Sequence, residues 1–314
     1  MESRIKELID NSKSILLLTH ERPDGDAIGS VLAFYHYLSS INKTVDMVIL
    51  DIPKVFNFLP SINKVVDNTS LEYELGICLD CATNERIGQK VDLISKCKKI
   101  INIDHHINNT NYGDINYVKG EISSCCQVVY YLFKEWNVSL DKKIGEAIIT
   151  GVLTDTNGFG NNNVDSDTFT IASDMIKLGV NVHGIYQKIL CLKTLPQYEL
   201  MKIGIDRLEL LFDGKIAFTY VLDKDFKEVR ACVGDHEGIV DIGRSICGVE
   251  VSIFLREDDG WLFSLRSTGT VDVGKIAMNL GGGGHRMAAG GKINSTFEET
   301  KNIIINEIKK VIFD

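Results

Sequence analysis

Aspartate and histidine residues gather at four points in the first half of the chain, a combination suited to binding divalent metal ions. These residues are His20, Asp24, Asp26, Asp80, Asp104, His105, His106 and Asp155. Carboxylate and imidazole ligands suit ions such as Mn²⁺, whereas a structural zinc site would favour thiolates. Any one of these aspartates alone is an ordinary turn or helix-capping residue. It is their joint placement that indicates a site.

Charge balance favours two ions over one. Four of the aspartates (Asp24, Asp26, Asp80 and Asp155) together carry a charge that two divalent cations would neutralise. Without metal, converging carboxylates repel one another and some must take up protons. An aspartate shared between two ions places them about 3.5–4 Å apart, the spacing used for in-line displacement at phosphorus. A hydroxide held between the ions is a nucleophile at neutral pH, so the residues predict phosphoryl chemistry.

The elements that must position these residues alternate between strand and helix. Three of the four points directly follow short apolar runs, at 15–19, 77–79 and 100–103, and another expected strand covers 45–50. Helical patterns lie between or after the strands, over 27–39, 86–97, 124–135, 142–153, 166–178 and 182–191. This alternation predicts an α/β domain with a mostly parallel sheet. Open sheets of this type build their sites at the carboxyl ends of the strands.

The pattern changes after residue 191. Residues 192–200, around Pro196, are expected to form a linker. Two hairpins are predicted beyond it, one of strands 205–212 and 215–221 around Asp213-Gly214, the other of strands 249–256 and 261–266. Helices are expected over 272–280 and 297–311. The chain is therefore predicted to form two domains, 1–191 and a smaller α+β domain over 201–314.

A glycine-rich run in the second domain could bind an anion. Residues 281–284 are all glycine, and His285 and Arg286 follow them. Glycines let the backbone approach a ligand closely, and exposed N–H groups bind anions. Arginine can hold a phosphate through two hydrogen bonds. The alternative is a flexible turn before a strand, and the glycines alone do not decide between the two.

Composition excludes several classes of protein. The 314 residues are 44% hydrophobic and 25% charged, an ordinary globular mixture, with a net charge of −9 that argues against a surface for long nucleic acid. No apolar run reaches the roughly 18 residues of a membrane span. The charged N-terminus does not resemble a signal peptide. The eight cysteines are expected to be reduced thiols, as in a cytoplasmic protein.

The order of these motifs resembles that of the DHH phosphoesterase superfamily. The resemblance rests on His20-x3-Asp24-x-Asp26, then Asp80, then Asp104-His105-His106, then Asp155, and it covers almost the whole chain. It implies an α/β fold in which a parallel-sheet DHH domain is joined by a linker to a smaller α+β DHH-associated domain. The active site is then expected in the cleft between the two domains.

The resemblance also implies a pair of metal ions, with ligands assigned by position and Mn²⁺ as the expected ion. One ion would be held by His20, Asp24 and Asp80. The other would be held by Asp26, Asp80, His105 and Asp155, so that Asp80 bridges the two. His106 would face the substrate, to stabilise the phosphate or protonate the leaving oxygen. Asp104 would orient a liganding imidazole.

Substrate contacts are implied mainly in the second domain. Gly283, Gly284, His285 and Arg286 resemble the GGGH motif that binds substrate in NrnA-type members, although many relatives have lysine where Arg286 stands. Arg266 and Ser267 resemble a phosphate-contacting Arg-Ser step of the same group. Ser123 and Ser124 resemble a serine pair near the site. The alternative for these two serines is that they cap the helix after them.

NrnA-type members of the superfamily are nanoRNases and pAp phosphatases. The resemblance therefore implies hydrolysis of short RNA oligonucleotides to mononucleotides, and removal of the 3′-phosphate from 3′-phosphoadenosine 5′-phosphate (pAp), by a metal-bridged hydroxide. The alternative substrates are linear pApA and cyclic-di-AMP.

Inorganic pyrophosphatase is disfavoured because those enzymes lack the glycine motif. A non-catalytic nucleotide sensor is disfavoured because such relatives lose metal ligands. The oligomeric state stays open, a homodimer being one alternative.

Overall fold

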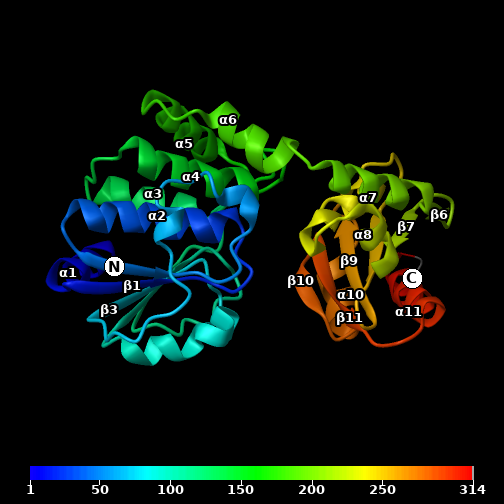
Figure 1. The fold of residues 1–314 in the computed structure, drawn as a ribbon, viewed down its shortest axis with the longest axis horizontal. Helices are drawn as coiled ribbons and strands as arrows, with labels where there is room; N and C mark the ends of the chain where they lie inside the picture. The colour runs from blue at the N-terminus through cyan, green and yellow to red at the C-terminus, as the bar shows by residue number, and fades with distance from the viewer. Residues whose placement is uncertain (313–314) are drawn as a thin grey trace. The chain divides into compact units, whose positions relative to one another are not determined.

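The chain forms two compact units, Met1–Leu192 and Lys193–Asp314, each built on its own sheet (Figure 1). The computed structural model describes residues 1–312, and the side chain of His285 lies outside what it describes. None of the helices in these residues is both long enough and apolar enough to cross a bilayer. All eight cysteines are free thiols.

A five-stranded parallel sheet forms the centre of the first unit. Its order is β2-β1-β3-β4-β5, with bounds Ser14–Leu18 (β1), Thr44–Val48 (β2), Leu75–Leu79 (β3), Ile100–Asp104 (β4) and Ile115–Val118 (β5). The parallel sheet predicted from the alternating pattern is confirmed. The sequence analysis missed β5, a short edge strand in which only alternate residues are buried.

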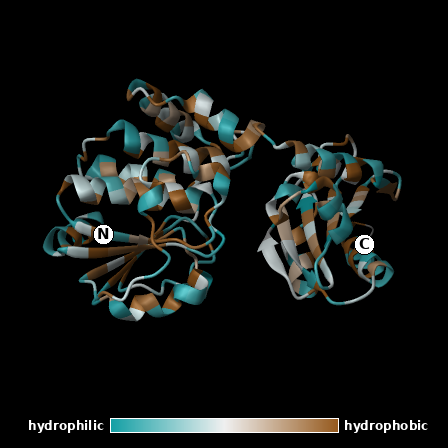
Figure 2. Cartoon of the chain, in the orientation of Figure 1, coloured by the Kyte–Doolittle hydropathy of each residue, from teal (hydrophilic) through white to brown (hydrophobic). Residues whose placement is uncertain are grey.

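Alternate strand residues supply the cores on the two faces of this sheet. Ile15, Leu17 and Ile77 pack into the larger core, whereas Leu16 and Leu18 pack into a smaller one on the opposite face. Helices α2 (Gly25–Ser40), α3 (Cys125–Glu135) and α4 (Lys142–Asp155) pack in the larger core, and the 3₁₀ segment η3 (Asn84–Lys96) packs on the smaller one (Figures 1 and 2). Because both faces are buried, the central strands β1, β3 and β4 are largely apolar runs.

The helices of the first unit mostly follow the predicted ranges. They are α1 (Glu2–Asn11), α2 (Gly25–Ser40), α3 (Cys125–Glu135), α4 (Lys142–Asp155), α5 (Ser166–Lys177) and α6 (Val182–Tyr186), with short 3₁₀ turns η1 (Lys54–Phe56) and η2 (Ile62–Lys64). Two expectations were wrong in detail. The helix predicted over 86–97 is the 3₁₀ segment η3 (Asn84–Lys96), interrupted where Gly88 has a φ of +66°. The helix predicted over 182–191 ends at Tyr186 and continues as the π-helical turn η4 (Gln187–Cys191).

A six-stranded mixed sheet forms the second unit, in the order β10-β11-β9-β8-β7-β6. The strands are β6 (Glu209–Leu211), β7 (Ile216–Val221), β8 (Val251–Glu257), β9 (Trp261–Ser267), β10 (Gly283–His285) and β11 (Ala288–Ile293). Only β7 and β8 pair in parallel; the other neighbours are antiparallel. The helices are α7 (Leu195–Asp206), α8 (Asp223–Val229), α9 (Ile239–Arg244), α10 (Val273–Asn279) and α11 (Phe297–Ile312), with the 3₁₀ turn η5 (Val233–His236).

The expected linker and the first expected hairpin strand of this unit need correction. Residues 195–200 are helical, because α7 begins at Leu195 with Thr194 and Gln197 forming a capping box around Pro196. Helix α7 runs to Asp206, so the strand predicted over 205–212 is reduced to the three residues of β6. The sequence analysis read the apolar residues at the end of α7 as the start of that strand.

Candidate active site

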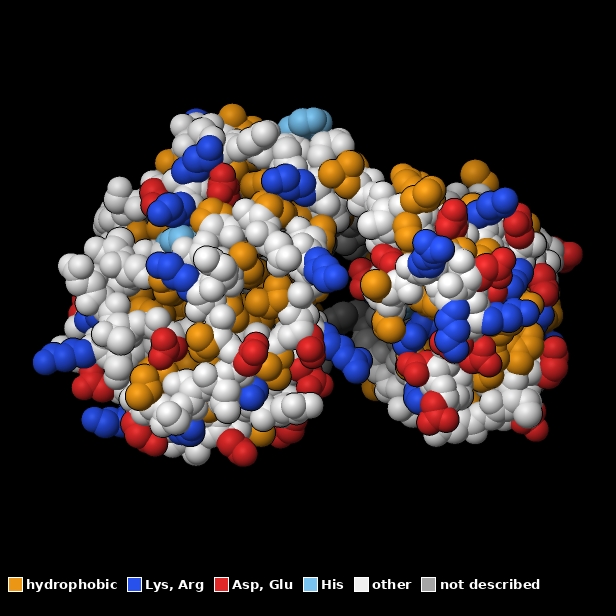
Figure 3. All heavy atoms as spheres, viewed as in Figure 1, with side chains coloured by type: hydrophobic (Ala, Val, Ile, Leu, Met, Phe, Trp, Pro, Cys, Tyr) orange, Lys and Arg blue, Asp and Glu red, His pale blue; other side chains and the backbone are white. Residues whose placement is uncertain are grey.

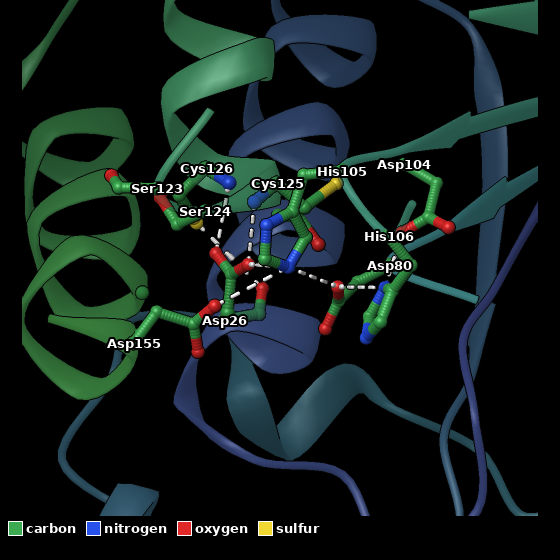
Figure 4. Close-up of polar contacts among 12 residues, drawn as sticks. Asp26, Asp80, Asp104, His105, His106, Ser123, Ser124, Cys125, Cys126 and Asp155 are labelled. Carbon is green, nitrogen blue, oxygen red and sulfur yellow. Dashed lines mark hydrogen bonds and ion pairs between the residues drawn. The ribbon is translucent and has the colours of Figure 1, made fainter. Parts of the chain in front are cut away.

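Polar groups from six elements of the first unit meet at the carboxyl edge of its sheet (Figure 4). The ends of β1, β3 and β4 lead into His20, Asp80 and the Asp104–His106 segment. Asp24 and Asp26 stand at the start of α2, and Asp155 is the last residue of α4. The first turn of α3 contributes backbone N–H groups. The sheet topology therefore brings together the residues that the sequence analysis singled out in this unit.

Asp24 and Asp26 are held differently although they are two residues apart. Asp24 caps α2, and its Oδ1 accepts hydrogen bonds from the backbone N–H groups of Asp26 and Ala27, both at 3.0 Å. Asp26 is fully buried, and its two oxygens accept from the backbone N–H groups of Cys125 at 2.5 Å and Cys126 at 2.8 Å. The positive end of the α3 dipole thus stabilises Asp26 as an anion.

Asp80 lies at the centre of the site and carries an unsatisfied oxygen. It is 1% exposed and has a φ of +54°, which turns the chain sharply after β3. Its Oδ2 lies 3.6 Å from Nε2 of His20. Its Oδ1 has no hydrogen-bond partner in the described part of the chain, the His105 Nε2 atom lying 3.4 Å away. A buried carboxylate oxygen without a donor is costly, and a bound cation would satisfy it.

His105 turns one ring nitrogen toward the carboxylates. Its Nδ1 is 3.1 Å from the carbonyl oxygen of Ile122 and so donates to it, which leaves Nε2 as the ligand atom. That Nε2 lies 3.3 Å from Oδ2 of Asp155, 3.4 Å from Oδ1 of Asp80 and 3.8 Å from Oδ2 of Asp26 (Figure 4). One imidazole therefore meets three carboxylates at a single point.

Three groups of side chains have ligand atoms close enough to share a metal ion. They are His20 with Asp24 and Asp80, Asp26 with His105 and Asp155, and Asp80 with His105 and His106; within each group the ligand atoms lie within 4.8 Å of one another. The first group is the first expected ligand set, and the second group contains three of the four residues of the other. Asp80 belongs to the first and lies beside His105 of the second. The donors and the unsatisfied Asp80 oxygen both fit divalent ions.

Charge repulsion and burial shift the pKa values of the metal-free site in both directions. Burial, together with the charge of Asp80, raises the pKa of Asp26 to about 7. Burial opposes charge on Asp80 too, but the neighbouring imidazoles of His105 and His20 hold the pKa of its carboxyl well below the ordinary value. Although burial lowers the pKa of His105, the nearby carboxylates of Asp80 and Asp26 raise it to about 11. Without cations, the site must therefore hold protons.

Asp104 orients His106 and not the liganding His105. Its Oδ1 accepts a hydrogen bond of 2.7 Å from Nδ1 of His106, and its Oδ2 accepts one of 2.6 Å from the side-chain amide of Asn109. The expectation that Asp104 orients a metal-liganding imidazole is therefore refined, because Ile122 fills that place for His105. Since a carboxylate only accepts, Nδ1 of His106 carries a proton, and any proton that the ring exchanges is on Nε2.

Ser123 and Ser124 are buried just before α3, and both bond to Gln127 in its first turn. The Ser124 hydroxyl caps the helix by accepting from the Gln127 N–H at 3.1 Å, and the Ser123 hydroxyl donates to the side chain of Gln127. Both serines are at most 1% exposed. This arrangement favours the capping alternative over direct substrate contact for the pair.

The expected substrate residues of the second unit lie at one end of its sheet. Arg266 pairs in register with Ala288, directly beyond the turn that holds Arg286. Its Nε lies 3.9 Å from Asp241, which also pairs with Arg244 at 2.9 Å. Ser267 is buried and accepts from Gly269 N–H at 3.0 Å, so it shapes the loop. Arg286 donates to the Gly269 carbonyl at 3.3 Å.

Backbone geometry explains the glycine run. Gly281 and Gly284 have φ values of +79° and +142°. A Cβ at Gly284 would approach the Ala288 carbonyl oxygen to 2.5 Å, so the β10–β11 pairing there tolerates only glycine. The strand expected after the glycines is present as β11, and part of the run itself is strand β10.

Sequence reasoning missed several residues that support the site. Asn109 binds Asp104, Asn163 donates to the carbonyl oxygens of Ser123 and Asp155, and Arg244 shares Asp241 with Arg266. Isolated asparagines and arginines carry no spacing signal. One sign was available: Asn102 interrupts the apolar run of β4, and a buried amide in a strand requires partners.

Comparison with known proteins places both units. Residues 14–152 match the DHH family, N-terminal domain, and residues 213–313 match the DHHA1 domain. The chain is 30% identical over 284 residues to the bifunctional oligoribonuclease and PAP phosphatase NrnA of Thermus thermophilus, covering 88% of this chain and 83% of that protein.

The chain is also similar to a solved structure and to a second enzyme. The crystal structure of an exopolyphosphatase-related protein from Bacteroides fragilis superposes with a TM-score of 0.94 at 28% identity, covering 98% of this chain and 95% of that one. The cyclic-di-AMP phosphodiesterase PdeA of Listeria monocytogenes is 25% identical over 330 residues, covering 98% of this chain but 48% of that protein.

Proposed function

The chain belongs to the DHH family of phosphoesterases, and on that basis we propose that it hydrolyses short RNA oligonucleotides to mononucleotides and removes the 3′-phosphate of pAp. The observation that carries the proposal is the meeting of two ligand groups at Asp80, whose buried Oδ1 lacks a hydrogen-bond partner among the described residues. Similarity to the Thermus thermophilus oligoribonuclease and PAP phosphatase over most of both chains supports the choice of substrate.

We propose that the cofactor is a pair of Mn²⁺ ions. His20, Asp24 and Asp80 would hold one, and Asp26, Asp80, His105 and Asp155 would hold the other. Bound there, divalent ions supply Lewis acidity toward phosphate oxygens and lower the pKa of water. The α3 N-terminus and the Ile122 carbonyl fix the Asp26 and His105 ligand atoms before any ion arrives.

His106 is the proposed acid for the leaving oxygen. Asp104 holds its Nδ1 proton, so Nε2 carries the proton that can be transferred. The buried Asp104 carboxylate also stabilises the positive charge of the protonated ring. Transfer of that proton to the departing ribose or nucleoside oxygen would complete the cleavage of the P–O bond.

The second unit is proposed to bind the part of the substrate away from the cleaved bond. Arg266, Arg286 and the backbone of Gly283 and Gly284 would contact a phosphate or sugar; His285 is assigned only from its motif. Guanidinium groups suit phosphate oxygens because they can donate two parallel hydrogen bonds. Arg244 joins this group through Asp241.

The charge distribution favours short substrates. The net charge is −9, and on the face shown in Figure 3 basic and acidic side chains are intermixed. Each phosphate bound by a long polymer adds an ionic contact, and that face carries no continuous basic stripe to make such contacts. With all eight cysteines free, we also propose a cytoplasmic location.

A second candidate keeps the site and changes the substrate to cyclic-di-AMP or pApA. Its support is the similarity to the Listeria monocytogenes cyclic-di-AMP phosphodiesterase across 98% of this chain. The reaction is again attack of water on a phosphate ester, so none of the assignments in the first unit changes. The two candidates differ only in the ends of the substrate that must be accommodated.

Product release from a panel of substrates tests the proposal. The panel contains pAp, 5′-labelled RNA of two to five nucleotides, pApA and cyclic-di-AMP, each with Mn²⁺ and with EDTA. We expect Mn²⁺-dependent cleavage of pAp and the short RNAs. Cleavage of cyclic-di-AMP or pApA alone would select the second candidate. Failure to cleave any of them by protein that retains bound Mn²⁺ would refute both.

A further inference from the structure

The side-chain amide of Asn109 bonds to the Asp104 oxygen that His106 does not. Its Nδ2 donates to Oδ2 of Asp104 at 2.6 Å and to Oδ1 of Asn102 at 2.7 Å. Its own Oδ1 accepts from the backbone N–H of Asn111 at 2.7 Å. The two amide protons and the carbonyl oxygen of Asn109 are thus all used.

The orientation of this amide is fixed by its neighbours. An ionised carboxylate only accepts hydrogen bonds, so the NH₂ end of Asn109 must face Asp104. Asn102, fully buried in β4, is held in turn because its Nδ2 donates to the Cys81 carbonyl at 3.1 Å and lies 3.2 Å from the Tyr112 hydroxyl. The chain of bonds therefore runs from the core of β4 to Asp104.

The backbone around Asn109 is tied to the same segment. The Asn109 N–H donates to the His106 carbonyl oxygen at 3.2 Å, which closes a turn just after the His105-His106 pair. Asp104 has two oxygens, one bonded to His106 and one to Asn109. If the bond to Asn109 is lost, the carboxylate can rotate about its Cβ–Cγ bond, and the His106 ring loses a fixed acceptor.

From these contacts we propose that Asn109 is a positioning residue for His106, acting through Asp104 to hold the ring in one tautomer with Nε2 as its reactive atom. This inference rests on the proposed function, in which His106 supplies the proton. The side chain of Asn109 bonds to Asp104, Asn102, Cys81 and Asn111, none of which is a proposed metal ligand. Its loss should therefore affect the chemical step and leave metal uptake intact.

A double-mutant cycle with a matched control tests the proposal. Asn109→Ala is compared with Asn108→Ala, an exposed neighbour in the same turn, and both are made in wild-type and His106→Ala backgrounds. Supporting groups of this kind are typically worth about 10–100-fold. We expect Asn109→Ala to lower kcat by about that factor with KM and Mn²⁺ affinity unchanged. Asn108→Ala should change none of these three quantities.

The His106→Ala background separates positioning from a general structural role. If Asn109 acts through His106, Asn109→Ala should lower kcat no further once the imidazole is gone. An equal loss in both backgrounds, or a loss of Mn²⁺ binding in titration calorimetry, would overturn the proposal. A wild-type protein that cleaves no substrate of the panel would instead refute the proposed function.

A measurement on the unaltered protein covers the case in which Asn109→Ala does not fold. The ¹⁵N shifts of the neutral His106 ring in the metal-free protein, assigned by difference from His106→Gln, report which nitrogen carries the proton. We expect the Nδ1-protonated tautomer. The Nε2-protonated tautomer would contradict the proposal whatever the activity.

Discussion

At the scale of single residues, two proposed metal ligands of the metal-free site have raised pKa values and therefore bind protons. Asp26 is buried with its two oxygens bonded to N–H groups, yet its pKa is raised to about 7, first by burial and then by the neighbouring charge of Asp80. His105, among three carboxylates, has a pKa raised to about 11. Metal ligands must be deprotonated, so binding and proton release are linked.

Uptake of Mn²⁺ at pH 7 should therefore release protons. The folded-state pKa values of Asp26 and His105 both lie at or above pH 7, so the metal-free groups hold protons there that the ions displace. We expect apparent Mn²⁺ affinity to rise with pH through 7, and to weaken below it. Calorimetric titration in two buffers of different ionisation enthalpy measures the release. Binding enthalpies that do not depend on the buffer would contradict this linkage.

Asp80→Asn should remove activity while keeping the fold. The change is isosteric, but Asp80 belongs to the group of His20 and Asp24 and its Oδ1 lies 3.4 Å from Nε2 of His105 in the other proposed set, so both proposed metal positions lose a charged oxygen. Loss of several kcal/mol of charge stabilisation corresponds to a kcat lower by about 10³-fold or more. Metal content and kcat are measured beside Asp67→Asn, an exposed aspartate that belongs to no ligand group. An Asp80→Asn protein with both ions and near-normal kcat would exclude the bridging assignment.

At the scale of elements, the crossing of α2 and α4 decides whether Asp155 reaches Asp26. Gly29 and Gly151 face each other there: a Cβ on Gly29 would lie 2.5 Å from the Ala147 carbonyl oxygen, and one on Gly151 would lie 2.5 Å from Oδ1 of Asp26. These two glycines let the helices approach closely enough to align their acidic residues.

Gly151→Ala should therefore damage the metal site more than helix propensity would suggest. Alanine favours the helix, but its methyl group would collide with Asp26 and the Cys126 sulfur, for a net cost of about 1–3 kcal/mol. Gly145→Ala in the same helix is the matched control, because the atoms nearest its methyl group belong to Val180, Met175 and Leu178, which are not proposed metal ligands. Both changes crowd buried atoms and can lower Tm, but we expect weaker Mn²⁺ binding for Gly151→Ala alone. Equal effects of the two changes would count against this account.

The elements also show what a sequence can predict and why the rest was missed. Strands β1, β3 and β4 were found because both sheet faces are buried, which makes each an apolar run, and so the carboxyl-edge residues were found with them. Strand β5 is short and at the edge, and η3 has the composition of an α-helix but is broken at Gly88. The capping of α7 at Thr194 was hidden by Pro196, which suits a helix start as well as a linker.

The contacts inside the site also divide into those that the sequence could predict and those that it could not. Residue types and spacing were enough to group Asp24, Asp26 and Asp80, because strand ends converge by topology. They could not show that Asp104 serves His106, since adjacent histidines are equivalent in a sequence. They could not show Asn109 either, because its partner Asp104 is reached through a turn whose course no pattern indicates.

At the scale of the whole molecule, the two units have separate cores. The clusters around Leu17 and Leu16 draw only on residues of the first unit, and those around Phe263 and Phe254 only on residues of the second. All the expected metal ligands are in the first unit. Ligand binding stabilises only the structure that forms the site, so the two units should respond differently to metal.

Scanning calorimetry should show two transitions, of which Mn²⁺ raises one. At about 100 times Kd, a ligand stabilises its site by roughly 2.7 kcal/mol, or a Tm higher by roughly 5–10 °C for a unit of this size. We expect that shift for the first unit and little change for the second. The Asp80→Asn protein serves as the control and should lose the shift. One transition that moves as a whole would show that the units unfold together.

The bonds from Cys125 and Cys126 to Asp26 also give the molecule a built-in reporter. Two backbone N–H groups at the start of α3 donate hydrogen bonds to the Asp26 carboxylate, so their chemical shifts depend on its charge. When that carboxylate exchanges a proton for a diamagnetic cation such as Mg²⁺, the resonances of these two amides must move, while those of the solvent-facing turns of α3 stay in place. Occupancy of the site could then be followed by NMR in the intact protein, without substrate and without an introduced label at the site.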